Sequence, residues 1–239
     1  MITGIVVALP EELSTLTSKK IDKGCCVFIT DNIALAYSGS GADNAWTAAE
    51  LLITQGATRL ISWGCAAALS ETLKPGDLVL PDTLIDAEGN RLDIHTNWLR
   101  FTKNLLSASI KIHSGSLAES KTIVAAAKDK KHLHAQTGAV ALDMESIAIA
   151  GVAQQNDLPF LAIRAIADPA NMDLPKAVNY SLNAEGDIVL GKLLLFIALD
   201  PAELPGLIKL GLHFNTAKNT LKLVAKQLDR LIALPSQDQ

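Results

Sequence analysis

The sequence predicts an α/β fold: a mainly parallel or mixed central sheet flanked by helices in three layers, plus a C-terminal helical extension. Short apolar runs rich in β-branched residues alternate along the chain with longer segments of helical composition. These runs are continuously apolar, which is typical of strands covered on both faces. In addition, 239 residues with 49% hydrophobic and 19% charged residues are enough for one large core. We therefore expect a single domain.

The expected elements follow one another through the first 170 residues. Strands are expected at the β-rich apolar runs, which are residues 2–9, 25–30, 33–37, 60–63, 78–84, 110–113, 139–142 and 160–167. Helices are expected between them, at residues 44–54, 97–108, 121–136 and 144–155. Gly56 is placed to end the first of these helices, because glycine readily adopts the left-handed conformation that follows a helix.

The composition changes at Pro201. A long amphipathic helix follows, and its apolar face carries Leu221, Val224, Leu228, Leu231 and Ile232. We expect residues 1–200 to form the main catalytic domain and residues 201–239 to be a helical extension of the same domain. The helix also carries a lysine stripe, which is either a solvated face or a contact for an anionic membrane surface. The stripe consists of Lys218, Lys222 and Lys226.

Charge and cysteine content exclude several classes of protein. The net charge of -4 and the aromatic content of 4% argue against nucleic acid as a partner. Cys25, Cys26 and Cys65 are an odd set without metal-ligand spacing, so we expect neither a disulfide framework nor a metal site. The first ten residues lack the basic region of a signal peptide, and no apolar run reaches the roughly 18 residues that a membrane span needs. We expect a cytoplasmic protein.

Two acidic segments indicate an active site. Residues 143–146 read Asp-Met-Glu-Ser, and residues 164–168 end an apolar run with Asp168. Glu145 is expected to open a helix and Asp168 to end a strand, so the intervening helix and strand bring the two carboxylates together. Two acids that converge on a small ligand can hold hydroxyl groups and deliver a proton.

Other expected strand ends are also polar or small, at residues 10–12, 38–41 and 64–66. In open α/β sheets, ligands bind beyond the carboxyl ends of strands. The sequence therefore predicts that these segments and Asp168 form one site.

The order of these segments resembles the purine nucleoside phosphorylase and methylthioadenosine/adenosylhomocysteine nucleosidase superfamily. The resemblance covers about residues 2 to 170, and the segments are specific in combination although each is weak singly. Residues 168–175 and 201–212 resemble the hopanoid-biosynthesis-associated phosphorylase branch, which is associated with removing adenine from adenosylhopane. The resemblance implies an enzyme that cuts the N-glycosidic bond of an adenine nucleoside with a 5′ substituent, without a cofactor.

The resemblance implies catalytic roles for Asp168, Arg164 and Glu12. Asp168 becomes the general acid that protonates purine N7, and a dry site must raise its pKa from about 3.9; alternatively it only begins a turn before Pro169. Arg164 becomes the residue that orients Asp168, although an extended strand separates the two by about 13 Å, or it pairs with another carboxylate. Glu12 becomes the residue that positions an attacking water, or a first-turn acid of a helix.

Further residues are implied to bind substrate. Glu145 accepts hydrogen bonds from the ribose hydroxyls, or stabilises the first turn of its helix, and Met144 packs on the sugar. The substrate pocket includes Cys65 and Ala66, although a small buried thiol is the simpler role for Cys65. Ile123 and Val124 are implied to make apolar contact with the purine. Ordinary packing in the core of a helix explains this pair equally well.

The nucleophile stays open between phosphate and water. Backbone N–H groups of Ser38, Gly39 and Ser40 at a helix start suit inorganic phosphate as a co-substrate, yet the segments that match the family contain no arginine for phosphate. Ala67 and Ala68 replace the usual glycines of the family, which disfavours a positive φ or a close backbone approach there.

Two alternatives to the adenosylhopane enzyme follow, namely a methylthioadenosine/adenosylhomocysteine nucleosidase and a nucleoside-binding protein without turnover. By resemblance we also expect a homo-oligomer, preferably a dimer, and a substrate that is lipid-linked. Peripheral contact with the inner face of the membrane is the less favoured alternative that the lysine stripe leaves open.

Overall fold

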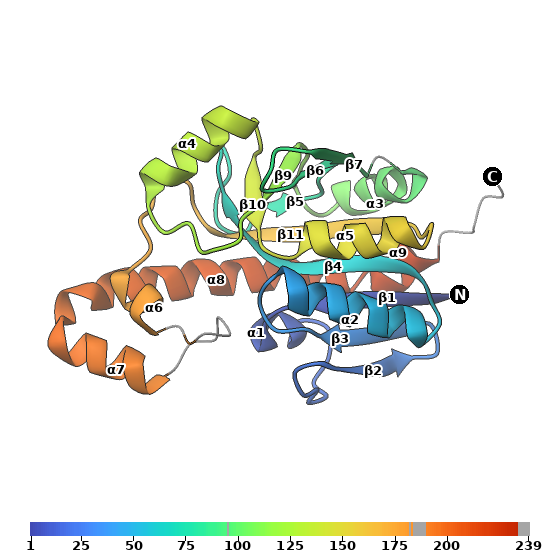
Figure 1. The fold of residues 1–239 in the computed structure, drawn as a ribbon, viewed down its shortest axis with the longest axis horizontal. Coiled ribbons are helices and arrows are strands. Elements are labelled where there is room, and N and C mark those ends of the chain that lie inside the picture. The colour runs from blue at the N-terminus through green and yellow to red at the C-terminus, as the bar shows by residue number, and fades with distance from the viewer. Residues whose placement is uncertain (95, 182, 184–189, 234–239) are drawn as a thin grey trace.

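The structure is a computed structural model that describes residues 1–94, 96–181, 183 and 190–233. Eleven strands within these ranges form one mixed sheet, with helices on both of its faces (Figure 1). The predicted α/β class with a helix-covered mixed sheet and a C-terminal helix is therefore confirmed.

The sheet branches at its longest strand. Its main path runs β2-β3-β1-β4-β10-β9-β6-β7, while β11 pairs with β4 and β5, and β5 pairs with β8. The strands are β1 (Ile2–Val7), β2 (Cys25–Thr30), β3 (Ile33–Tyr37), β4 (Ala57–Ala68), β5 (Leu78–Val79), β6 (Thr83–Ile85), β7 (Arg91–Asp93), β8 (Ile112–His113), β9 (Ser116–Glu119), β10 (Ala141–Asp143) and β11 (Phe160–Asp168). Since β1, β3, β4 and β11 pair in parallel, their carboxyl ends lie at one edge of the sheet.

The sheet differs from prediction at residues 78–84, where one expected strand is two. Pro81 lies between β5 and β6, and proline cannot donate a ladder hydrogen bond. β4 extends well beyond the expected residues 60–63. Its last residues, Ala67 and Ala68, pair with β10 in ordinary strand conformation, so the replacement of the family's glycines strains no backbone here.

Nine α-helices and one 3-10 helix are present in the described residues. They are α1 (Pro10–Leu13), α2 (Ala42–Thr54), α3 (Asn97–Ser107), α4 (Ala127–Thr137), α5 (Ser146–Gln155), α6 (Lys176–Ser181), α7 (Leu190–Leu199), η1 (Pro201–Glu203), α8 (Leu204–Ala225) and α9 (Leu228–Ile232).

The helix expected at residues 121–136 begins only at Ala127. Ile123 and Val124 precede it outside the helix, in keeping with the low helix preference of β-branched side chains. The backbone N–H of Ala127 donates to Asp173 Oδ1 at 2.7 Å, so a distant segment fixes where α4 starts.

The sheet separates two apolar layers, each covered by helices. One layer joins Val6 of β1 to residues of α2 and α5, and the other joins its neighbours Ile5 and Val7 to α3, α8 and α9. Successive side chains of a strand point to opposite faces, so a continuously apolar strand serves both layers.

The C-terminal helices belong to the second layer. α8 packs against β11 and buries Ala217, Leu221 and Val224. Trp98 Nε1 of α3 donates to the carbonyl of Leu231 at 3.0 Å, and Arg59 of β4 donates to the carbonyl of Ile232. The division of the chain at residue 200 stays a prediction, and residues 234–239 of the predicted extension lie outside the described residues. Within the described ranges, no helix combines the length and apolar character that a membrane span requires.

Candidate functional site

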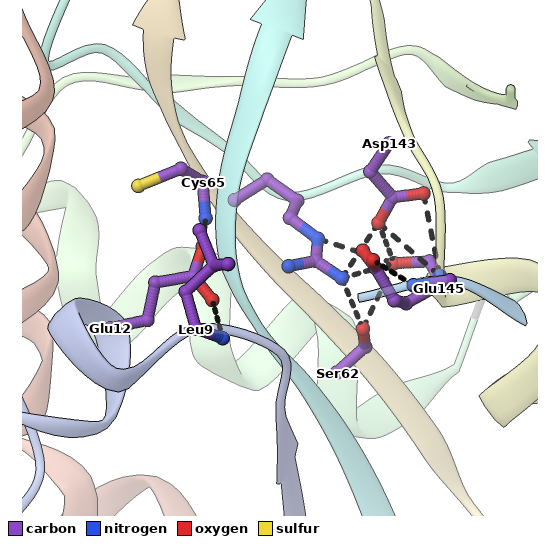
Figure 2. A network of polar contacts seen from close by, with 9 residues as sticks. Leu9, Glu12, Ser62, Cys65, Asp143 and Glu145 are labelled. Atoms are coloured by element: carbon purple, nitrogen blue, oxygen red, sulfur yellow. Dashed lines mark hydrogen bonds and ion pairs between the residues drawn. The ribbon is translucent and has the colours of Figure 1, made fainter. Parts of the chain in front are cut away.

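A buried polar network lies toward the carboxyl ends of β1, β4 and β11, and Arg164 of β11 is its centre. Its Nη2 atom lies 2.6 Å from Asp143 Oδ2 and also donates to the hydroxyls of Ser62 and Ser146. Figure 2 shows Ser62, Asp143 and Glu145 gathered around this guanidinium group. Burial alone would lower the pKa of Arg164, but the neighbouring carboxylates outweigh it and raise that pKa.

Arg164 does not serve Asp168 as the resemblance implied. Its ion-pair partner is Asp143, which agrees with the alternative that it pairs with another carboxylate. The pairing follows from strand register: Arg164 lies beside Gly64 of β4, whereas Asp168 lies beside Ala67 after a register shift in β11. The two side chains therefore join different contact groups.

Glu145 is held from another element. The backbone N–H of Gly41, where α2 begins, donates to Glu145 Oε1 at 3.0 Å. Burial and the nearby Asp143 raise the pKa of Glu145, while Arg164 opposes them. At the start of α5 the side-chain capping contacts come from Asp143, which accepts from the Ser146 hydroxyl at 2.6 Å. The carboxylate of Glu145 is thus not the cap of its own helix.

Glu12 reaches the same network from α1. Glu12 is 3% exposed, and its carboxylate accepts from the N–H of Cys65 at 2.7 Å and of Leu9 at 3.1 Å (Figure 2). Burial raises the pKa of Glu12 to about 7, against the opposing effect of Arg164. A carboxyl group with such a pKa can accept or donate a proton near neutrality.

Gly64 leaves the space in which the side chains of Glu12 and Arg164 lie. A Cβ atom at this position would lie 2.4 Å from Arg164 Nη1 and 2.7 Å from Glu12 Oε1. Real Cβ contacts are not that short, so the side chains of Glu12 and Arg164 occupy the space that any other residue would fill.

Asp168 ends β11 and pairs with Lys130 of α4, whose Nζ lies 2.6 Å from Asp168 Oδ2. Asp168 Oδ1 is buried and has no hydrogen-bond partner in the described structure. Burial raises the pKa of Asp168, and Lys130 opposes that rise. The raised pKa is the condition that a general acid at this position requires.

The predicted substrate-binding residues have mixed surroundings. Met144 and Cys65 are half-buried, and burial raises the pKa of the Cys65 thiol. Ala66 packs in the layer with α2 and α5, and Val124 packs against a small cluster that includes Leu142. Packing therefore accounts for Ala66 and Val124 without a ligand, and the pocket assigned to them and to Ile123 stays a prediction.

The turn at residues 38–41 offers fewer donors than the sequence suggested. Among the expected donors, the backbone N–H of Ser38 donates to the carbonyl of Val7 at 2.9 Å. The Ser38 hydroxyl also donates to the carbonyls of Val7 and Gly39, and the neighbouring Gly41 N–H donates to Glu145. The Lys23 side chain also covers Gly39, since a Cβ there would lie 2.1 Å from Lys23 Cε. Phosphate binding by Ser38, Gly39 and Ser40 stays a prediction.

Three contributors escaped the sequence reasoning. Asp143 stands two residues before Glu145 in the quoted motif, and Gly64 stands before Cys65, so both were visible but had no assigned role. Lys130 gave no signal, because it sits in a charged run that reads as a solvated helix face. The described residues contain no cluster of three or more His, Cys, Asp or Glu side chains suited to a metal ion.

Residues 3–187 match the family model of the phosphorylase superfamily. The chain belongs to the phosphorylase superfamily. It is an enzyme of the nucleoside phosphorylase and nucleosidase type. A 5′-methylthioadenosine/S-adenosylhomocysteine nucleosidase of Buchnera aphidicola is 28% identical over 209 residues, which are 75% of this chain and 83% of that protein. A Staphylococcus aureus protein with the same description is 24% identical over 197 residues, covering 70% and 86% of the two chains.

Solved structures show the same fold. The 5′-methylthioadenosine/S-adenosylhomocysteine nucleosidase of Helicobacter pylori superposes with a TM-score of 0.71 and 18% identity. The superposition covers 96% of this chain and 97% of that one. Futalosine hydrolase of the same organism also gives a TM-score of 0.71 and 18% identity, with 96% of each chain covered.

Proposed function

We propose that the protein hydrolyses the N-glycosidic bond of an adenine nucleoside that carries a 5′ substituent, with adenine as the leaving base. The observation that carries this proposal is a pair of buried acids with raised pKa, Glu12 in the short helix after β1 and Asp168 at the end of β11. The nucleosidase relatives support it, and one Helicobacter pylori structure contains 5′-methylthioadenosine in the active site.

Each acid has one task in this reaction. Glu12 in its ionised form removes a proton from water, whose oxygen bonds to C1′ of the ribose. The C1′–N9 bond breaks, and Asp168 in its protonated form gives its proton to N7 of the departing adenine. Glu145 accepts hydrogen bonds from the ribose hydroxyls and thereby fixes C1′ between the two acids.

Water is the nucleophile that we favour over phosphate. Glu12 needs no ion to activate water, whereas the Ser38 N–H, one of the donors expected for phosphate, already donates to the carbonyl of Val7. The test is adenine release from 5′-methylthioadenosine and adenosine with and without phosphate. Free ribose products support the proposal, and ribose 1-phosphate that appears only with phosphate would replace it with phosphorolysis.

We further propose adenosylhopane as the substrate, with a lipid at the 5′ position. Its support is an exposed apolar surface on α7 and α8, in a part of the chain beyond residue 187, where the match to the family model ends. Figure 1 shows these helices projecting past the sheet. The surface consists of Leu194, Leu195, Leu199, Leu204, Ile208 and Leu212, and Leu199 is 74% exposed. We propose that the same surface gives the protein its peripheral contact with the inner membrane face.

The lipid proposal is tested with the variant Leu199→Ser/Ile208→Ser/Leu212→Ser. We expect its KM for adenosylhopane to rise by about 10-fold or more, because one buried leucine contributes about 1.5–3 kcal/mol, while 5′-methylthioadenosine turnover stays unchanged. Leu223→Ser is the control, since Leu223 is equally an exposed leucine of α8 outside this surface. Sedimentation with phosphatidylglycerol vesicles measures membrane contact in the same proteins.

A second copy of the chain is the competing occupant of this surface, and a homodimer is our proposal for the assembly. Sedimentation equilibrium separates the cases. A dimer that dissociates in the triple variant, together with unchanged adenosylhopane turnover, would assign the surface to the second copy. The simpler 5′-methylthioadenosine/S-adenosylhomocysteine nucleosidase is the alternative activity, and equal KM changes for both substrates would favour it.

A nucleoside-binding protein without turnover is the remaining alternative. Its basis in the sequence was the alanine pair at residues 67 and 68, and both residues lie in regular strand. It predicts binding of 5′-methylthioadenosine without adenine release.

A further inference from the structure

Lys130 is completely buried, although it belongs to a run of charged residues. Its exposed fraction is 0%, whereas its neighbours Lys128, Asp129 and Lys131 on α4 are exposed. A buried ammonium group costs several kcal/mol unless it is paired and hydrogen-bonded. A lysine in this position therefore requires acceptors that compensate for the loss of water.

The ammonium group of Lys130 has three acceptors, which equals its number of N–H donors. Nζ lies 2.6 Å from Asp168 Oδ2, 2.9 Å from the carbonyl of Met172 and 3.1 Å from the carbonyl of Pro169. All three acceptors belong to the end of β11 and the turn after it. The side chain of Lys130 thus ties α4 to the segment that carries Asp168.

The two oxygens of Asp168 are consequently unequal. Oδ2 is held by Lys130, while Oδ1 is buried without a hydrogen-bond partner in the described part of the chain. An unpartnered buried oxygen is unfavourable, and it is satisfied when it carries a proton that it donates to a ligand. Oδ1 is the oxygen that can hold the proton for a nucleobase.

We infer that Lys130 is a positioning residue for the general acid: it fixes Oδ2 of Asp168 so that Oδ1 carries the transferable proton. This inference rests on the proposed function. Lys130 also moderates the acid, since burial raises the pKa of Asp168 and the ammonium group lowers it. The other charged groups at this end of the sheet have partners of their own, because Arg164 pairs with Asp143 and Asp173 caps α4.

The inference distinguishes Lys130 from a residue that merely stabilises the fold. Loss of its charge should raise the pKa of Asp168 by about one unit or more, the usual effect of an opposite charge at this distance. The high-pH limb of kcat, where Asp168 loses its proton, then moves upward. A purely structural lysine would lower the melting temperature without moving this limb.

The experiment compares Lys130→Met, Lys130→Arg and the wild type, with Lys131→Met as the matched control on the exposed side of α4. Adenine release from 5′-methylthioadenosine is measured across pH, and the Asp168 carboxyl is titrated by ¹³C NMR, which needs no turnover. We expect kcat of Lys130→Met to fall about 10- to 100-fold through misplacement of the acid, with KM little changed. The pKa of Asp168 should rise in this variant and stay at its wild-type value in Lys131→Met.

Lys130→Arg keeps the charge but not the geometry, so it should lose kcat while its high-pH limb stays in place. This variant keeps the test decisive if Lys130→Met does not fold. An Asp168 titration that is the same in a folded Lys130→Met and in the wild type overturns the inference alone. Absence of adenine release by the wild type overturns the proposed function, and the catalytic role of Lys130 with it, while the titration still measures the pairing.

Discussion

The protein has two buried clusters of acidic side chains, one around Arg164 and one at Lys130. They differ in how many carboxylates share one cation. Around Arg164, the carboxylates of Asp143, Glu145 and Glu12 act on one guanidinium group, whereas the ammonium group of Lys130 serves Asp168. Because Arg164 is shared among three carboxylates, its charge does not offset the burial of Glu12, and the pKa of Glu12 rises to about 7. At Asp168 burial also raises the pKa, and its own cation, Lys130, opposes the rise. Both acids thus have a raised pKa, and they differ in whether the opposing cation is shared with other carboxylates.

The largest expected effect is that of Asp168→Asn, which removes the proton from the individually paired group. We expect kcat for adenine release to fall by about 10³- to 10⁴-fold, at the upper end of what a general acid contributes. Binding of 5′-methylthioadenosine, measured by calorimetry, should persist because the amide keeps the shape of the carboxyl. Near-normal turnover would show that the proton comes from elsewhere.

Glu12→Gln tests the shared group and should lower kcat by about 10²- to 10³-fold, since the base that activates water is lost. Ionised Glu12 is the active form, so kcat/KM of the wild type should fall as pH drops through about 7. The variant should lack this limb. Glu11→Gln, at the exposed neighbouring position of the same short helix, is the control.

Gly64→Ala tests whether the Glu12 and Arg164 side chains need the space beside β4. The added methyl group would collide with both, so we expect a loss of about 1–3 kcal/mol in the free energy of unfolding, together with a fall in activity. Gly211→Ala is the matched control, because a Cβ at Gly211 in α8 meets no atom within 4 Å. Equal stability of the two variants in urea would contradict the packing described here.

The last comparison is the pH dependence of stability. The folded-state pKa of Glu12 is raised from 4.5 to about 7, so its favourable contribution is complete below pH 4.5 and is lost as pH rises to 7. The free energy of unfolding of the wild type should therefore decline relative to Glu12→Gln over this range, by about 3 kcal/mol at most. Urea unfolding at pH 5, 6, 7 and 8 measures the difference, and parallel curves would mean that Glu12 titrates normally.

The fold was largely predictable because the strands that contribute side chains to both apolar layers are continuous apolar runs rich in β-branched residues. β2 and β3 have the predicted bounds, while β4 was underestimated because alanine and glycine dominate its second half. The start of α4 was wrong because Asp173, 46 residues later, determines it. Local sequence cannot reveal such a cap.

Site residues that follow adjoining strands could be predicted from the sequence. The partners of these residues could not be predicted where they depend on which side of a helix faces the sheet. Glu12 and Glu145 both act on Arg164, whereas the expected convergence of Glu145 with Asp168 stays a prediction. The resemblance assigned Arg164 to Asp168, but strand register gives it Asp143 instead. Lys130 could not be told from Lys128 and Lys131, since its burial depends on which side of α4 meets the sheet end.

The anchoring of α9 has a consequence for biosynthesis. Trp98 and Arg59 donate to the carbonyls of Leu231 and Ile232, which fixes α9 against one side of the sheet. Until α8 and α9 have been synthesised, aliphatic residues on that side of the sheet lack part of their cover. A variant without these two helices would expose this apolar layer while it keeps Glu12, Glu145 and Asp168.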